Sequence, residues 1–242
     1  VEFPGRRGTL RALDDISFSI APGEILGVVG ESGAGKSLTG AAIIGLLEPP
    51  GRVASGQILL EGQRIDNLSN EEMRHIRGRR IGAIFQDPLT SLNPLYTVGR
   101  QLTETILAHL PVNAAEARQR AIQLLKDTGI PAAEERIDHY PHQFSGGMRQ
   151  RVVIALALAA EPKLIVADEP TTALDVSIQA QIITLLKNIC KSRGAAVMLI
   201  THDMGVIAET CDRVAVLYAG RVAEIGPVHD CLLYTSPSPR DS

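Results

Sequence analysis

Aromatic residues are scarce in this chain of 242 residues: they make up only 3% of it, and tryptophan is absent. The core must therefore be filled by alanine, leucine, isoleucine and valine, and a hydrophobic content of 45% indicates a globular protein rather than a disordered one. Cysteine is also rare. Cys190, Cys211 and Cys231 are scattered and form no CxxC pair, which argues against a zinc site or a disulfide framework.

The chain also lacks a strong net charge and a long apolar run. A net charge of −3 gives no electrostatic reason to expect nucleic acid as a partner, and we interpret the basic stretch Arg74 to Arg80 as solvated surface. The longest apolar runs fall far short of the roughly 20 residues that span a bilayer, and no signal peptide is evident. We expect a soluble protein of a reducing compartment, which another chain would have to anchor at any membrane. Because the first residue is Val1, we also expect a truncated start.

Strand and helix patterns alternate along the chain. Residues 13–20 alternate apolar and polar side chains, and residues 25–29 are continuously apolar, so we expect two strands around a turn. The alternation predicts an α/β fold with a mainly parallel sheet, and the run of helical patterns in its middle predicts an inserted helical subdomain. The expected boundaries are a core of about 1–87 and 161–230, with the helical subdomain at about 88–160.

The stretch GESGAGKS, between an apolar strand pattern and an apolar helix pattern, matches a phosphate-binding loop. Glycines let the backbone curl so that its N–H groups point at phosphate oxygens, and the following helix adds its positive end. Lys36 is expected to reach the β- and γ-phosphates, and Ser37 to offer a hydroxyl to Mg²⁺. The predicted ATP contacts from this segment are Gly30, Glu31, Ser32, Gly33, Ala34, Gly35, Lys36, Ser37 and Leu38.

Carboxylates follow a second buried strand pattern. Asp168 and Glu169 come at the end of LIVADEP, at the sheet edge where α/β proteins bind ligands. With a phosphate loop in the same chain, Asp168 is predicted to hold Mg²⁺ and Glu169 to act as the general base toward the attacking water. Without that loop, a surface turn would be the better interpretation.

Two further polar residues end strand patterns. Gln86 follows AIF, and His202 follows VMLIT, so both side chains could reach a γ-phosphate. A lone histidine after a strand is more often structural, but the parallel with Asp168 favours a catalytic role here. The predicted catalytic set is Lys36, Gln86, Glu169 and His202, and the predicted Mg²⁺ ligands are Ser37, Gln86 and Asp168.

These motifs, in this order, resemble the ATP-binding subunit of an ABC transporter from about Leu13 to Pro227. The resemblance identifies Gln86 as the Q-loop, FSGGM at Phe144 to Met148 as the signature, Asp168 with Glu169 as the Walker B end, ALD at Ala173 to Asp175 as the D-loop, and His202 as the switch histidine. Met148 replaces the usual glutamine of the signature. The aromatic residue that stacks on adenine in many members is missing from GRRGTLRAL, so Phe3, Leu10 or an arginine remain candidates.

The stretches FQDPLTSLNPLYTVGRQ, YPHQFSGGMRQR and DEPTTALDVSIQAQI are typical of importers of oligopeptides and dipeptides, a branch that also contains nickel and glutathione importers. The resemblance implies a P-loop NTPase (RecA-like) core with an N-terminal antiparallel β subdomain and an inserted helical subdomain. It implies a head-to-tail dimer of ATPase subunits, identical or paralogous. Ser145, Gly146, Gly147 and Asp175 would contact the ATP held by the other subunit. It also implies a separate membrane permease, an indirect link to a solute-binding protein, no nucleic acid, and a peripheral position on the cytoplasmic face of the cell membrane.

Other protein classes fit less well. A soluble ABC ATPase of ribosomes or DNA usually carries two fused ATPase units or a long coiled-coil insert, and a regulatory module without turnover would lack Glu169 or His202. Export is disfavoured because no membrane span is fused, although exporters also use separate subunits.

The last residues, CLLYTSPSPRDS, lack apolar periodicity, so we expect disorder. A phosphorylated tail is one interpretation. We prefer another, because the codons TGT-CTC-TTA-TAC-ACA-TCT for Cys-Leu-Leu-Tyr-Thr-Ser resemble a transposase adapter used in sequencing libraries. Residues 231–242 are therefore predicted to be a non-native read-through tail.

Overall fold

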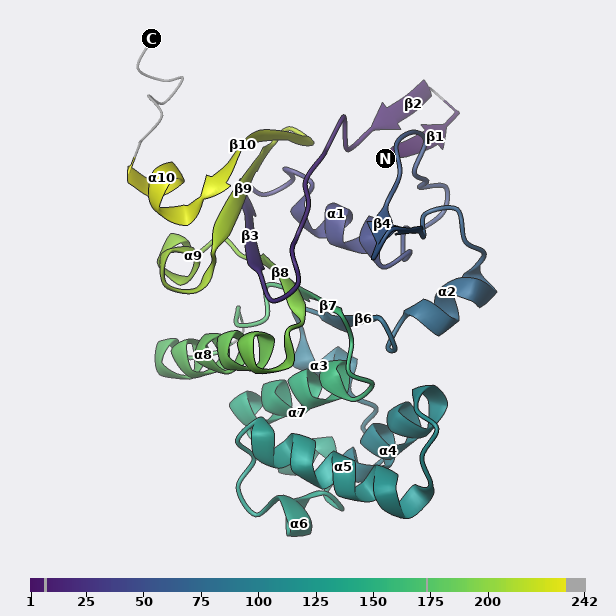
Figure 1. Ribbon diagram of the computed structural model, residues 1–242, viewed down its shortest axis with the longest axis vertical. Helices are drawn as coiled ribbons and strands as arrows, with labels where there is room; N and C mark the ends of the chain where they lie inside the picture. The colour runs from purple at the N-terminus through teal and green to yellow at the C-terminus, as the bar shows by residue number, and fades with distance from the viewer. Residues whose placement is uncertain (7, 173, 234–242) are drawn as a thin grey trace.

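A central six-stranded sheet organises the protein (Figure 1). The computed structural model describes residues 1–6, 8–172 and 174–233. Five strands run parallel, and β10 pairs antiparallel with β9 at one edge. Across the sheet the order is β10 (Arg221–Pro227), β9 (Arg213–Tyr218), β3 (Ile25–Gly30), β8 (Ala196–Ile200), β7 (Leu164–Asp168) and β6 (Ile81–Ile84).

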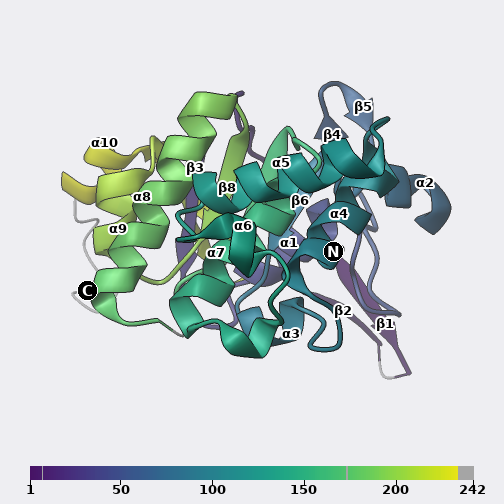
Figure 2. The ribbon, with the colours of Figure 1, turned by 90° about the horizontal axis from the view of Figure 1, so that it is seen from below.

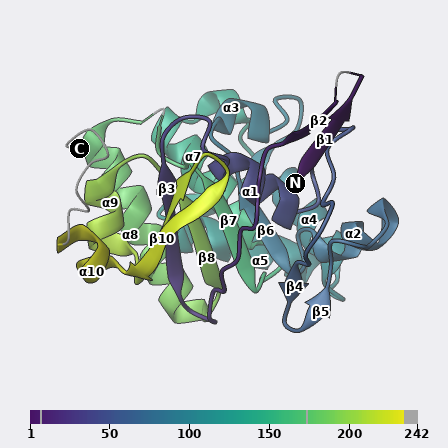
Figure 3. The same cartoon turned by 90° about the horizontal axis from the view of Figure 1, so that it is seen from above.

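Helices cover both faces of the sheet, which is why its strands are continuous apolar runs. Helix α1 (Lys36–Ile43) packs so closely on one face that a Cβ on Gly40 would lie 3.1 Å from Val166 Cγ1 and 3.3 Å from Ile200 Cδ1. The other face contributes Ile165, Val197 and Leu199 to a cluster shared with the helices below. Figure 3 shows α8 (Val176–Arg193), α9 (Met204–Thr210) and α10 (Val228–Leu233) at one side of the molecule.

The helical segment lies beneath the sheet (Figures 1 and 2). Side chains from its helices and from the sheet belong to one continuous buried cluster, which includes Leu102, Leu125, Ile154 and Ile165. The helices are therefore present as expected, while the division into two subdomains at residues 88 and 160 stays a prediction. The segment comprises α3 (Pro88–Ser91), α4 (Val98–His109), α5 (Ala114–Asp127), α6 (Ala133–Arg136), a 3₁₀ turn (Pro141–Gln143) and α7 (Gly146–Leu158).

Two small antiparallel hairpins flank the sheet. Strand β1 (Glu2–Gly5) pairs with β2 (Gly8–Arg11), and β4 (Leu59–Leu60) pairs with β5 (Gln63–Arg64). Helix α2 (Asn70–Ile76) follows the second hairpin and begins with a capping box between Ser69 and Glu72. The sequence pattern Ser-x-x-Glu carries this signal, but we did not predict the helix from it.

The strand expected at residues 13–20 is wrong. These residues form no strand, although Ile16, Phe18 and Ile20 pack against the buried cluster around Leu26 and Val28. Alternation reports which side chains face a core, whereas a strand also needs a hydrogen-bonding neighbour. Burial was therefore predicted correctly here and strand pairing was not.

The predicted tail begins inside a helix, because α10 extends to Leu233. Disorder is thus wrong for residues 231–233. The rest of the tail, residues 234–242, lies outside the described residues, and its non-native origin stays a prediction. In the part of the chain that the structure describes, no helix combines the length and apolar character that a bilayer crossing requires.

Candidate active site at the carboxyl edge of the sheet

Four parallel strands deliver the predicted polar residues to one edge. Gly30 ends β3, Gln86 follows β6, Asp168 ends β7, and His202 follows β8. Because these strands run in the same direction, their carboxyl ends meet at one edge, where open α/β sheets bind ligands. The sheet register thus brings together residues that are up to 172 positions apart between Gly30 and His202.

Two glycines of the phosphate loop lie close against other parts of the chain. A Cβ placed on Gly30 would lie 2.2 Å from the carbonyl oxygen of Leu217, and Gly30 has a φ of 151° that side chains rarely adopt. A Cβ on Gly35 would lie 2.4 Å from Leu13 Cδ2, at a φ of 99°. Both positions therefore require glycine for local conformation and for close packing.

Lys36 folds back over this loop. Its Nζ donates to the carbonyl oxygens of Gly30 at 2.8 Å and Glu31 at 2.9 Å, and the residue is only 8% exposed. The ammonium group is thus held inside the loop by neutral acceptors. A phosphate oxygen would be a stronger, charge-assisted partner at this position.

Helix α1 starts at the loop with an uncovered end. Its N-cap is Gly35, which makes no side-chain cap hydrogen bond. The first N–H groups of a helix have no partner within the helix and carry a partial positive charge. With Lys36 beside them, these groups fit an anionic phosphate group.

Ser37 and Asp168 form the oxygen pair expected of a magnesium site. Ser37 Oγ donates to Asp168 Oδ1 at 3.0 Å, across 131 positions of sequence. Burial raises the pKa of the Asp168 carboxyl, the Ser37 hydrogen bond opposes that rise, and the charge of Glu169 adds to it. A hydroxyl and a carboxylate are ligands that Mg²⁺ prefers, and a cation here would relieve the cost of burying the charge.

Glu169 is the centre of a second cluster. It has a φ of 46°, and its carboxylate is approached by Gln86 Nε2 at 3.4 Å and by His202 Nδ1 at 3.4 Å. Thr172 Oγ1 donates to the same carboxylate at the shorter distance of 2.8 Å. The structure therefore brings Gln86, Glu169 and His202 together as predicted, with Gln86 on the Glu169 side of the site. Its role as a Mg²⁺ ligand stays a prediction.

Sequence reasoning missed Thr172. Its hydroxyl reaches Glu169 because the chain turns between the two residues, and side chains of threonine often bond to groups about three positions away in turns. The signal was the spacing Glu-Pro-Thr-Thr directly after the strand.

Comparison with known proteins decides the family. A family model described as "ABC transporter" matches residues 13–172, which is more than half of the chain. The chain belongs to the ABC transporter family. The oligopeptide transport ATP-binding protein OppD of Bacillus subtilis is 51% identical over 95% of this chain, and the dipeptide transport ATP-binding protein DppD of Escherichia coli is 51% identical over 95%. The chain spans 64% of the first relative's length and 70% of the second's.

Solved structures of the ABC family agree with the fold. A dimeric ATP-binding cassette in a post-hydrolysis state with ADP and Pi has a TM-score of 0.82 and 30% identity, covering 94% of this chain and 95% of its own. The structure of CbiO1 from Clostridium perfringens, part of an ABC transporter complex, has a TM-score of 0.81 and 32% identity, covering 96% and 88%.

The ABC signature occupies the start of α7. Ser145 is the N-cap, and its Oγ accepts a hydrogen bond from the Met148 N–H at 3.4 Å. A Cβ on Gly147 would lie 2.9 Å from Ile178 Cγ2 on α8, so this chain itself requires glycine there. A Cβ on Gly146 would meet only Leu174 Cδ2, at an ordinary 3.9 Å. Packing within this chain therefore explains Gly147 but not Gly146, and the contact of either residue with a second subunit's ATP stays a prediction.

The D-loop is partly described. Ala173 lies outside the described residues. Asp175 is exposed and caps α8 without a side-chain hydrogen bond to the helix, and the neighbouring Val176 is 82% exposed. A carboxylate that makes no hydrogen bond among the described residues, beside an exposed apolar residue, suits contact with a second subunit, which stays a prediction.

The three candidates for adenine contact differ in exposure. The ring of Phe3 packs on Gly51, where a Cβ would lie 2.6 Å from Phe3 Cε1, and Phe3 is half-buried. Leu10, on the paired strand, is 66% exposed. The choice among Phe3, Leu10 and an arginine stays open.

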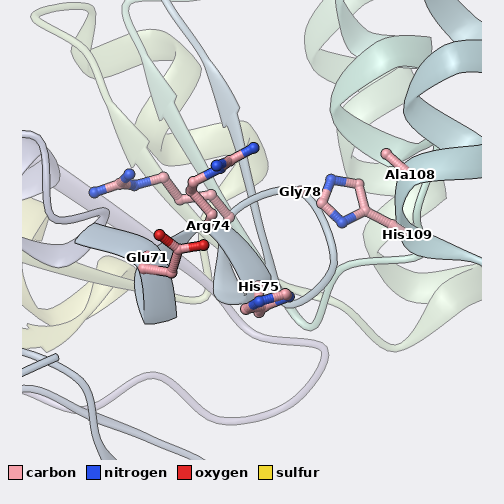
Figure 4. Close-up of a pocket in the computed structure, with 7 residues that line it drawn as sticks. Glu71, Arg74, His75, Gly78, Ala108 and His109 are labelled. Carbon is pink, nitrogen blue, oxygen red and sulfur yellow. The ribbon is translucent and has the colours of Figure 1, made fainter. Parts of the chain in front are cut away.

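Two cavities flank this ABC fold. One, of about 420 Å³, adjoins the site and is lined by Ser37, Asp168 and Phe85 among others. The other, of about 480 Å³, lies between α2 and α4 and is shown in Figure 4 with Arg74, His75 and His109 around it. Arg77 also lines this second cavity.

We expected the basic stretch Arg74 to Arg80, beside the second cavity, to be solvated surface. Some of its arginine side chains instead bind backbone carbonyl groups. Arg77 donates to the carbonyl oxygens of Ile44 and Gly45 just after α1, and Arg79 donates to that of Ala160 after α7. Arg80 donates to the Leu60 carbonyl. These side chains complete helix ends and a hairpin, because carbonyl groups at helix ends lack internal partners.

Proposed function

We propose that this protein hydrolyses ATP in a head-to-tail pair of ATPase subunits and so powers the import of peptides through a separate membrane permease. The observation that carries the proposal is the meeting of Lys36, Ser37, Asp168 and Glu169 at one sheet edge, with Gln86 and His202 beside Glu169. Each group has a distinct task in phosphoryl transfer to water.

The triphosphate would bind where Lys36 now meets carbonyl oxygens. Lys36 and the first N–H groups of α1 would hold the phosphate oxygens. Lys36 would give up its hydrogen bonds to the carbonyl oxygens of Gly30 and Glu31 when it binds phosphate. Ser37 and Asp168 would hold Mg²⁺, which neutralises charge on the β- and γ-phosphates when bound.

Glu169 would accept the proton of the attacking water. Its side chain is 21% exposed and so remains within reach of solvent, while Gln86 and His202 approach the carboxylate from two other strands. Gln86 would orient the water and His202 would steady the γ-phosphate, because positioning supplies most of the catalysis in phosphoryl transfer.

The second half of the site would come from another subunit. Ser145 and Gly146 are exposed at the start of α7, and Asp175 is exposed at the start of α8. Solved relatives of this fold are described as dimeric. A helix start with an exposed hydroxyl and no obstructing side chain suits a γ-phosphate that arrives from outside the chain.

The relatives' names support the proposed peptide import. Proteins half identical to this chain are called oligopeptide or dipeptide transport ATP-binding proteins. We propose the same cargo class, a permease that docks on the helical segment, a solute-binding protein that acts through the permease, and a position on the cytoplasmic face of the membrane.

Glu169→Gln tests the hydrolysis mechanism. The amide keeps the shape of the side chain but cannot accept the proton, so turnover should fall about 10² to 10⁴-fold while ATP binding persists. Turnover is measured by phosphate release and binding by equilibrium titration with Mg²⁺-ATP. Lys36→Ala is the matched contrast, because it should weaken binding itself. Near-normal turnover in Glu169→Gln would remove Glu169 from the role of base.

The cargo is tested separately. The protein, reconstituted with its permease and solute-binding protein in vesicles, should accumulate labelled dipeptides or oligopeptides when ATP is supplied on the side of the ATPase subunits. ATP-dependent accumulation of nickel or glutathione instead would contradict peptide import and leave the hydrolysis mechanism untouched.

A further inference from the structure

The hydroxyl of Thr172 makes the shortest side-chain contact of the Glu169 carboxylate. Thr172 Oγ1 donates to Glu169 Oε2 at 2.8 Å, whereas Gln86 Nε2 and His202 Nδ1 lie at 3.4 Å from the two carboxylate oxygens. Hydroxyl hydrogen bonds to oxygen are strongest at about 2.7–2.8 Å, and contacts near 3.4 Å are much weaker. Thr172 therefore restrains this carboxylate more than the Q-loop or the switch histidine does.

The backbone places Thr172 for this contact. The Thr172 N–H donates to the Glu169 carbonyl oxygen at 3.3 Å, which closes a turn around Pro170. Glu169 has a φ of 46°, a strained conformation for a non-glycine residue that persists only where the surroundings hold it. Residue 172 thus bonds residue 169 through both its backbone and its side chain, and Pro170 stiffens the link between them.

The hydroxyl makes no other hydrogen bond among the described residues, and Thr172 is exposed. A packing role would need burial. The neighbouring Thr171, in contrast, is 8% exposed and fits a structural role in the core. The hydrogen bond to the Glu169 carboxylate is therefore the contact that explains a hydroxyl at position 172.

We propose that Thr172 is a positioning residue that holds the Glu169 carboxylate in the orientation from which it accepts the proton of the attacking water. The inference rests on the proposed function, in which Glu169 is the general base. Fixing one oxygen, Oε2, leaves Oε1 to receive the proton, with His202 beside it. Loss of the hydroxyl frees the side chain to rotate, and misplacement by about 1 Å can cost a factor of about 10² in rate.

The first test replaces the hydroxyl while it keeps the shape. Thr172→Val should lower kcat roughly 10- to 100-fold with KM for ATP unchanged, because nucleotide binding does not use this side chain. Thr172→Ser keeps the hydroxyl and should restore most of kcat. Thr184→Val, which removes an exposed hydroxyl bonded to the Ala180 carbonyl within α8, should leave turnover unchanged. Equal turnover in wild type and Thr172→Val would overturn the proposal, as would failure of serine to rescue.

A double-mutant cycle separates positioning from general damage to the turn. If Thr172 acts through Glu169, then Thr172→Val should cause no further loss in a Glu169→Gln background. An additional loss there of the same size as in the wild type would mean that Thr172 acts elsewhere, and would overturn the proposal. If Glu169→Gln itself turns over normally, the proposed function fails. If only Thr172→Val is normal, this inference fails alone.

Discussion

Two helices of this protein begin after glycine-rich segments, and their beginnings differ. At α1, Gly30 and Gly35 are pressed against Leu217 and Leu13, and Lys36 closes the loop from within. At α7, Ser145 caps the helix, Gly147 is pressed against Ile178, and Gly146 has space around it. The first segment combines the features predicted for phosphate binding within one chain. The second has one glycine that packing within its own chain does not explain, which suits the proposed half-site completed by another subunit.

The comparison also separates two reasons for glycine. A glycine with positive φ or a close backbone neighbour is required for folding, and its replacement should lower stability. A glycine in open space at a helix start lowers stability slightly, and packing within the chain does not explain it; for Gly146 we propose contact with a second subunit's ATP. The following predictions distinguish these reasons by measuring stability and turnover on the same variants.

Gly30→Ala should have the largest effect on stability. The new Cβ would meet the rigid carbonyl of Leu217 at 2.2 Å, at a φ of 151°. Backbone strain of about 1–3 kcal/mol adds to a packing penalty of about 1–3 kcal/mol, so the free energy of unfolding should fall by about 3 kcal/mol or more. Urea unfolding measures it. Gly33→Ala is the control, because its φ of 81° strains the backbone but no atom lies within 4 Å. Similar losses for both variants would contradict the steric explanation.

Gly147→Ala should have an intermediate effect. The added Cβ would lie 2.9 Å from Ile178 Cγ2, and the stiff branched side chain of isoleucine gives way only at a cost of about 1–2 kcal/mol. Ile178→Ala removes the opposing atom, so the loss on adding Gly147→Ala should shrink in that background when thermal unfolding is followed. Additive losses would show that α7 and α8 do not meet at this point.

Gly146→Ala should have the smallest effect on stability and the opposite sign. Only Leu174 Cδ2 comes within 4 Å of the new Cβ, at 3.9 Å, and alanine reduces the entropy of the unfolded chain, so stability should rise by about 0.4–1 kcal/mol. ATP turnover should nevertheless fall, because the methyl group would stand between two subunits. A more stable protein with unchanged turnover would contradict the role of Gly146 in a shared site.

Much of the site was predictable because it depends on local patterns. A strand, a glycine loop and a helix in succession fix the phosphate loop, and polar residues directly after apolar strands must lie at one edge of a parallel sheet. Lys36, Ser37, Asp168, Glu169 and His202 were found in this way.

Other features were missed because they depend on neighbours that no local pattern names. Alternation at residues 13–20 reported a buried face, but strand formation needed a partner that was not there. The side chains of Arg77 and Arg79 look like free surface charges until the carbonyl groups after α1 and α7 come within reach.

Residue types and their order along the chain were enough to predict a phosphate loop, an acidic strand end and a signature, and to indicate an ABC ATPase. The folded chain was needed to show which glycine is required by packing, which hydroxyl bonds Glu169, and which arginines bind carbonyl groups at helix ends. The two kinds of information differ in the distance over which they act. Backbone propensity and residue type act over a few positions, whereas a 2.8 Å hydrogen bond or a 2.9 Å Cβ contact depends on how separately encoded segments pack together.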